Sequence, residues 1–371
     1  MKQAKQIFPL TSLRFFAAFL VVLHHTLPTI VPSIEHAGWP ARLQTFSGTT
    51  VLLFFILSGF VLALVYLEPE TPIAKRNFWA VRVARIYPLY LTAIALDVPN
   101  LFHARLLKYG LDAALLKTSI TFAGSALFLQ QWFPFLGGLD FPSWSLSVEA
   151  LFYAIFPMLG PVLWRWPLRM QLATSVVTYL FFWGAAILGS LRDIPALVSQ
   201  PITFLPYFIS GIVLASLRQR IALRPDWLAQ CRALAPAGVL LAAVALILGC
   251  LVRVPVIDAV LPGGIFLPAY SLLLLCFAIG SPAIERVFSH RWLILLGEAS
   301  YALYLLHILI WGWFLHMHLP MNPFTYVLYL AAAIALSIVS FRYLEVPARR
   351  WLLRRWHERS HETKLASSLA Q

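Results

Sequence analysis

The sequence has few charged residues and few cysteines. Charged side chains make up 12% of its 371 residues, whereas hydrophobic ones make up 60%. Soluble domains of this length do not show that balance, and repeated long apolar runs are typical of proteins that cross a membrane many times. The three cysteines provide no disulfide framework, and the sequence shows neither a zinc-site spacing nor a glycine-rich phosphate loop. We therefore expect a membrane protein without a metal site.

Acidic residues are also scarce, because 28 lysines and arginines stand against 15 aspartates and glutamates. In a soluble protein a net charge of +13 would suggest nucleic acid as a partner. Here the cations cluster between apolar segments, which is the pattern of cytoplasmic loops in membrane proteins. The first apolar run contains an arginine and lacks a small-residue cleavage site, so we expect a retained span rather than a signal peptide. The expected surroundings are membrane lipids, not nucleic acid.

Eleven apolar stretches are candidates for membrane helices, and most are too long and continuous for membrane β-strands. The expected fold is therefore an all-α, polytopic helical bundle. The stretches lie at about 10–31, 48–67, 86–104, 119–136, 143–164, 171–191, 202–217, 235–252, 262–281, 295–317 and 324–344.

The positions of the basic clusters test this count of eleven. If both the N-terminal lysines and the arginine-rich C-terminus are cytoplasmic, the number of crossings must be even. Eleven is odd, so one candidate must not cross. The two possibilities are 86–104 and 119–136, either of which could be re-entrant or lie along the surface. The sequence predicts about ten spans and leaves that choice open. We expect one membrane domain over 1–355 and a polar tail over 356–371.

Arg14 and His25 lie eleven residues apart in the first apolar segment. This is about three turns at roughly 3.6 residues per turn, so both side chains share one helix face. Ionisable groups at membrane depth usually face a cavity or a partner and mark function. His25 fits a general base, and Arg14 fits an anion contact at the inner mouth of a cavity. The alternatives are a packed core histidine and an arginine that reaches lipid head groups.

Three further charged residues belong to the predicted site. Arg82 and Arg85 are three residues apart, which places both guanidinium groups on one side of a helix, where they suit phosphates. An ordinary cytoplasmic flank is the alternative. Glu149 lies inside a long apolar helix and does not complete a capping box, since Leu146 stands three residues before it. Glu149 could orient His25 as the acid of a catalytic triad does, or it could form a structural ion pair.

A second polar set opens the tenth apolar segment. Tyr304 and His307 share one helical stripe there, and hydrogen bonds between helices explain that set best. Ser58 and Gly59 are expected to permit close helix packing. The residues kept as further pocket candidates are Ser58, Trp144, Ser147, Tyr301 and His307.

Together these motifs resemble the acyltransferase 3 family, whose members are integral-membrane O-acyltransferases of bacterial surface and exported glycans. The resemblance covers nearly the whole chain, and the order and spacing of the motifs carry it. The matching elements are Arg14 followed by ten residues and His25, Phe54–Phe60, the Arg82–Arg85 pair before Ile86-Tyr87-Pro88, Trp144–Glu149 with Phe152, Tyr153 and Pro157, Ser300–His307 and Tyr343–Pro347.

The resemblance implies transfer of an acyl group, acetyl first, from cytoplasmic acyl-CoA to a hydroxyl of a glycan or lipid-linked glycan, such as O-antigen of lipopolysaccharide or an exopolysaccharide. It implies that His25 is catalytic with Arg14 beside it, and that Arg82 and Arg85 hold the CoA phosphates. The implied location is the bacterial inner membrane, with both termini cytoplasmic. Ala150 departs from relatives that carry a second acid after Glu149. The rival interpretation is a membrane transporter of a glycan or small solute, against which the sequence shows no inverted repeat.

Overall fold

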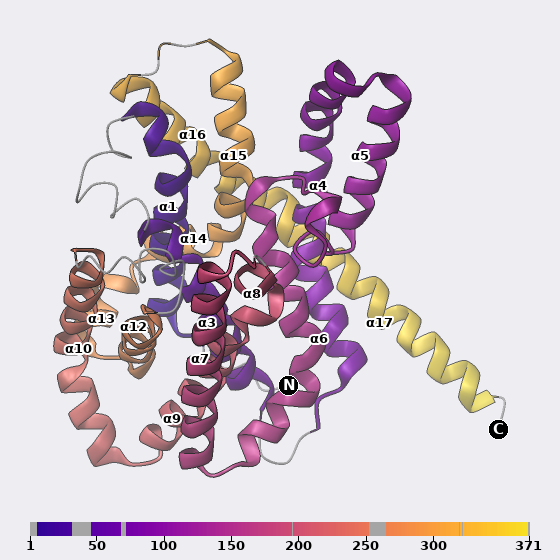
Figure 1. The fold of residues 1–371 in the computed structure, drawn as a ribbon. Helices are drawn as coiled ribbons and strands as arrows, with labels where there is room; N and C mark the ends of the chain where they lie inside the picture. Colours follow the sequence, from indigo (N-terminus) through magenta and orange to yellow (C-terminus); the bar gives the residue numbers. More distant parts are fainter. Residues whose placement is uncertain are drawn as a thin grey trace.

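A computed structural model of the protein describes residues 6–31, 46–67, 72–194, 196–251, 265–318, 320 and 322–369. These residues form helices and no strand (Figure 1). The α-helices are α1 Phe8–Ile30, α3 Val51–Tyr66, α4 Lys75–Tyr109, α5 Leu111–Ala126, α6 Trp144–Arg165, α7 Leu168–Leu191, α8 Ala196–Ser199, α9 Leu205–Ala222, α10 Pro225–Leu251, α12 Leu267–Ile279, α13 Pro282–Phe288, α14 Arg291–Glu298, α15 Ser300–His316, α16 Pro323–Ser340 and α17 Val346–Leu369. The 3₁₀ turns are η2 Pro134–Leu136, η3 Phe141–Ser143 and η4 Pro201–Phe204, and the π-helical turn is η5 Phe341–Glu345.

The expected all-α membrane bundle is confirmed, but the count of about ten spans is not. In the described residues, seven helices are long and apolar enough to cross a membrane. The number rises to nine if α12 with α13, bent by 92°, and α14 with α15, bent by 61°, each count as one span. Neither 86–104 nor 119–136 is among these candidates.

The two uncertain segments belong to one long hairpin. α4 has 35 residues and α5 has 16, and the two meet at Gly110, whose positive φ of 78° turns the chain. The end of α5 lies beside the middle of α4, because Tyr87 and Tyr90 donate hydrogen bonds to the carbonyl oxygens of Ala126 and Ser125. α5 therefore covers the second half of α4, and the hairpin projects at the upper right of Figure 1.

α6 lies against the first half of α4. The indole of Trp79 donates a hydrogen bond to the carbonyl oxygen of Tyr153, over 2.9 Å. α5 and α6 are joined by residues 127–143, so together they return along the whole length of the single helix α4. α5 therefore lies along α4 and does not run through the bundle by itself.

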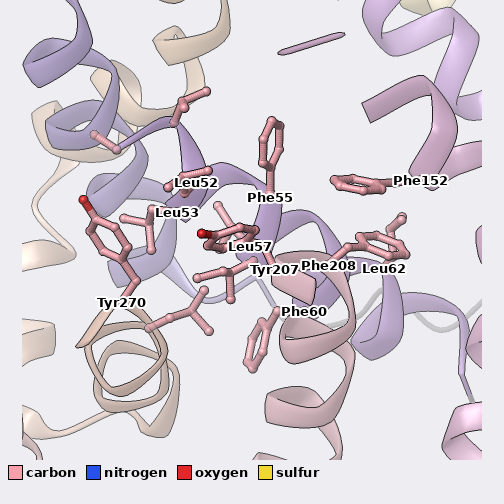
Figure 2. Packing of buried hydrophobic residues seen from close by; sticks show 14 of the residues in the cluster. Leu52, Leu53, Phe55, Leu57, Phe60, Leu62, Phe152, Tyr207, Phe208 and Tyr270 are labelled. Atoms are coloured by element: carbon pink, nitrogen blue, oxygen red, sulfur yellow. The ribbon is translucent and has the colours of Figure 1, made fainter. Parts of the chain in front are cut away.

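The centre of the bundle is the pair α3 and α9. A Cβ on Gly59 would lie 2.1 Å from the carbonyl oxygen of Phe208, and a Cβ on Gly211 would lie 2.0 Å from that of Ile56. Only glycine permits this approach, as is common where small residues join membrane helices. Phe152 of α6 stacks on Phe208 with centroids 4.5 Å apart (Figure 2). The expected packing role of Gly59 thus corresponds to a direct backbone contact.

α1 is held by polar contacts to helices on two sides. Ser12 donates a hydrogen bond to the carbonyl oxygen of Phe288, and Thr50 donates one to the carbonyl oxygen of Ala17 over 3.0 Å. α1 also packs along α14 and α15. These contacts fix the rotation of α1, and therefore the direction of its ionisable residues.

The residues expected to form a polar tail lie within α17, which is helical to Leu369. α17 packs against α4 and follows α16 through the π-helical turn η5. Arg76 of α4 lies over the ring of Trp356, with 6.0 Å from the guanidinium carbon to the ring centroid. The beginning of the predicted tail is therefore docked on the bundle.

Candidate functional site

His25 of α1 meets His307 of α15. Nδ1 of His25 lies 2.9 Å from Nε2 of His307, and the two ring planes differ by 12°. His307 is completely buried, whereas His25 is half-buried. The two histidines are 282 positions apart in the sequence, so the pairing depends on the packing of α1 against α15.

The hydrogen bonds of His307 determine the tautomers of both rings. Nδ1 of His307 lies 2.7 Å from the carbonyl oxygen of Tyr304. A carbonyl oxygen only accepts, so this Nδ1 carries the proton, and Nε2 of a neutral His307 must accept. His25 therefore donates through its Nδ1, which leaves the lone pair of its Nε2 free. We refer to His25 and His307 in this arrangement as the histidine pair.

The segment before α6 lies against the histidine pair. The ring of Phe141 contacts His25 edge to face, with centroids 5.4 Å apart. Tyr304 donates a hydrogen bond to the carbonyl oxygen of Pro142 and contacts the hydroxyl of Ser145, both over 2.8 Å. Tyr304 of α15 thus holds this segment through its side chain and orients His307 through its carbonyl oxygen.

Arg82 occupies an aromatic cage. Its guanidinium carbon lies 5.3 Å from the ring centroid of Tyr66, and 5.8 Å from those of Phe78 and Tyr153. It also donates a hydrogen bond to the hydroxyl of Tyr66 over 3.1 Å. Its buried Nε has no hydrogen-bond partner among the described residues. The cage holds Arg82 in place and leaves part of its guanidinium group unsatisfied.

Arg85 lies on the same side of α4 but in different surroundings. The charges of Arg85, Arg14 and Arg349 all act on the carboxylate of Glu345. Glu345 is 1% exposed, and neither of its oxygens has a hydrogen-bond partner among the described residues. The four arginines Arg14, Arg82, Arg85 and Arg349, with Glu149 and Glu345, are called the arginine cluster below. The charges of the predicted Arg14 and Arg85 act on each other, and Arg82 is linked to them through Arg349, on which its charge acts.

Glu149 belongs to the arginine cluster rather than to the histidine pair. Its carboxylate accepts hydrogen bonds from Tyr153, one turn later on α6, and from Ser58 over 3.4 Å. Its charge also acts on Arg14. The hydrogen bond of His25 is made with His307, and no hydrogen bond joins Glu149 to His25 among the described residues.

α1 and α15 connect the two groups. α1 carries Arg14 in the arginine cluster and His25 in the histidine pair, separated by about 16 Å at roughly 1.5 Å per residue. α15 carries Tyr301, on which the charges of Glu345 and Arg85 act, and then His307. Tyr301 donates a hydrogen bond to the carbonyl oxygen of Ile86 over 2.9 Å. Neighbouring helices therefore link the cluster to the pair.

Two other predicted candidates have structural contacts. Trp144 packs between the rings of Phe55 and Phe204, with centroids 6.2 Å and 5.4 Å away. Ser147 donates a hydrogen bond to the carbonyl oxygen of Phe128. These contacts position the start of α6, and none of them involves the histidine pair.

The sequence analysis missed Asp140 and the roles of Glu345 and Arg349. Asp140 is 1% exposed, and both of its carboxylate oxygens lack a hydrogen-bond partner among the described residues. Burial, together with the nearby charge of Asp97, raises the pKa of Asp140 well above its ordinary value. The available signal for Asp140 was an acid four residues before the Trp144–Glu149 motif. For Glu345, the signal was an acid in the last motif. Among the described residues, no group of three or more histidines, cysteines, aspartates and glutamates could hold a metal ion.

Comparisons with known proteins agree with this arrangement of motifs. Acyltransferase MdmB of Streptomyces mycarofaciens is 29% identical over 198 residues, which are 52% of this chain and 46% of that protein. A putative O-acetyltransferase of Staphylococcus aureus (strain COL) is 24% identical over 324 residues, covering 80% of this chain and 52% of that protein. Peptidoglycan O-acetyltransferase OatA of Listeria monocytogenes is 24% identical over 317 residues, covering 80% and 50%.

The chain therefore spans about half the length of the curated relatives that it matches. No solved structure matches it. The family model described as "Acyltransferase domain" matches residues 10–342, which include the histidine pair and most of the arginine cluster. A match of this extent, over nearly all of the described bundle, shows that the chain is a membrane protein of the acyltransferase 3 family.

Proposed function

We propose that this protein transfers an acyl group, acetyl first, from acyl-CoA to a hydroxyl of a cell-surface or exported glycan. The observation that carries the proposal is the hydrogen bond between His25 and His307, which leaves one basic nitrogen available on a half-buried ring. The names of the relatives support O-acetyl transfer, and one of them names peptidoglycan as the substrate of that relative.

In the proposed reaction, Nε2 of His25 removes the proton from the acceptor hydroxyl as its oxygen attacks the thioester carbonyl carbon. The bond between the carbonyl carbon and sulfur then breaks, and the protonated His25 returns the proton to the departing thiolate. His307 supports this step, because its Nε2 accepts a hydrogen bond that strengthens when His25 becomes positive. His307 is therefore a positioning residue and His25 the catalytic residue.

Arg82 and Arg85 of the arginine cluster would bind the phosphates of the donor. Guanidinium groups match phosphate oxygens in charge and geometry, and Arg85 and Arg14 are both half-buried. The thioester lies at the other end of the extended donor. It would therefore reach the histidine pair, which is about three turns of α1 away from Arg14. The proposed location is the bacterial inner membrane, with both termini and the donor on the cytoplasmic side. The acceptor would be a glycan or lipid-linked glycan, of the O-antigen or exopolysaccharide kind, on the other side.

The proposal is tested by mass spectrometry of surface glycans from cells that express the wild type or the His25→Ala variant. Loss of the general base should reduce acylation by about 10²- to 10⁴-fold. His24→Ala is the matched control, since the neighbouring ring of His24 does not carry the hydrogen bond to His307. Membrane levels of all three proteins must be equal. Near-normal acylation by His25→Ala would refute the proposal.

A further inference from the structure

The end of η5 and the start of α17 contribute two charged residues to the arginine cluster, Glu345 and Arg349. The π-helical turn η5 ends at Glu345, and the next helical turn carries Arg349. π-helical turns inside α-helices frequently occur at functional sites. Here the turn places Glu345 in a buried position and leaves Arg349 half-buried against α4.

The charges of the cluster do not balance. Four arginines carry four positive charges, and Glu149 and Glu345 carry two negative charges when ionised, which leaves two positive charges in excess. The charges of Arg85 and Arg82 both act on Arg349, so like charges are gathered at one place. Such a group requires an anion nearby. A phosphate monoester, with a charge of about −1.5 to −2 at neutral pH, provides the missing charge.

Glu345 also lacks direct partners. Its carboxylate is almost fully buried and has no hydrogen bond among the described residues, although three arginines act on it. Burying a carboxylate in this way is costly unless cations compensate its charge. Glu345 and an incoming phosphate would therefore compete for the same arginines.

From these observations we propose that α17 is part of the donor site: Arg349 binds a phosphate group of the donor, and Glu345 is the anion that this phosphate replaces at the arginines. This inference rests on the proposed function for the identity of the donor. It extends that function by adding Glu345 of η5 and Arg349 of α17, and it assigns opposite effects to them.

The test measures CoA binding to purified full-length protein by isothermal titration calorimetry. Arg349→Gln should raise the Kd by about tenfold, the loss expected for one charge-assisted contact. Arg350→Gln is the matched control, because Arg350 is the exposed neighbour of Arg349 and should bind like the wild type. Arg349→Lys, which keeps the charge, should retain most of the affinity, so that a loss confined to Arg349→Gln is assigned to the missing charge.

Glu345→Gln should change the Kd in the other direction, because the competing anion is removed. We expect binding several-fold tighter than that of the wild type. Dephospho-CoA identifies the phosphate: if Arg349→Gln weakens only CoA, Arg349 contacts the ribose phosphate, and if it weakens both ligands, the diphosphate is the contact. Both results support the inference.

Three results separate the possible failures. If Arg349→Gln and Arg350→Gln bind CoA equally well, Arg349 is not a donor ligand. If Glu345→Gln binds more weakly than the wild type, Glu345 organises the arginines and does not compete with the donor. Either result overturns this inference but leaves the proposed function intact. If the wild type itself does not bind CoA, the proposed function fails first.

Discussion

A single hydrogen bond decides which nitrogen of His25 is available for chemistry. The carbonyl oxygen of Tyr304 fixes the proton of His307 on Nδ1, and His307 in turn fixes the proton of His25. Without these two hydrogen bonds, either nitrogen of His25 could carry the proton. The lone pair would then not always lie on Nε2. His307 would thus orient His25 as a carboxylate orients a catalytic histidine, but it accepts the hydrogen bond as a neutral group.

His307→Ala should lower kcat strongly while the KM for acyl-CoA changes little, because the proposed contacts of the donor phosphates are with Arg82 and Arg85 rather than with the histidine pair. His307→Gln should recover part of the loss, since its amide oxygen can accept from Nδ1 of His25. The pH–rate profile should also move, because the partner of the titrating ring has changed. Steady-state kinetics of purified protein over a range of pH would measure all three effects. Equal activity of the two variants with an unmoved profile would limit His307 to a packing role.

Asp140 should make stability depend on pH. Its folded-state pKa is raised, so between its ordinary pKa and the raised value the unfolded chain releases this proton while the folded protein keeps it. Stability therefore falls as pH rises through that window. Asp140→Asn removes the effect and should raise the melting temperature at neutral pH. The gain should vanish at acidic pH, where Asp140 is protonated in both states.

Thermal unfolding of the detergent-solubilised protein at several pH values would test this expectation. An Asp140→Asn variant that melts at or below the temperature of the wild type at neutral pH would contradict it.

Among the elements, α3 and α9 depend most on backbone contact. Gly59→Ala should lower the free energy of unfolding by roughly 1–3 kcal/mol, since its Cβ would meet the carbonyl oxygen of Phe208. Gly184→Ala on α7 is the matched control, because nothing lies within 4 Å of the new Cβ. Thermal unfolding of both variants gives the comparison. Equal stability would mean that the two helices can separate without cost.

The sequence predicted individual helices better than their connections. The apolar runs located most of the membrane helices, and the helical spacing placed Arg82 and Arg85 on one side of α4. The partner of His25 could not be found in this way, because the two histidines meet only through tertiary packing of α1 on α15. Glu345 was missed for a related reason. Helical periodicity assumes regular turns, and the π-helical turn η5 breaks that regularity just before Glu345.

For the whole molecule, the path of α4, α5 and α6 decides the topology. α4 has 35 residues and is about 52 Å long at roughly 1.5 Å per residue, whereas the hydrocarbon core of a bilayer is about 30 Å thick. α5 has 16 residues, or about 24 Å, and only covers the second half of α4. α4 is not among the helices that are both long and apolar enough to cross a membrane, but its length is sufficient, whereas that of α5 is not. We therefore expect α4 to cross the membrane and α5 not to cross on its own.

Cysteine labelling tests this path. In a variant without the three native cysteines, a cysteine at Lys117 in α5 should react with an impermeant reagent from the side opposite to a cysteine at Arg76. The reason is that the turn at Gly110 lies at the far end of α4 from Arg76. Labelling of both positions from one side would show that α4 does not cross.

The rotation of the last helix also depends on chain length. The wider turn η5 absorbs its extra residue, whereas removing one residue from the regular turn between η5 and Arg349 would turn everything that follows by about 100°. Arg349 would then point away from α4, and Trp356 would leave Arg76, even though no side chain in either contact had been altered. A one-residue deletion there should therefore be more harmful than most substitutions at the same positions, because insertions and deletions change the phase of a helix whereas substitutions do not.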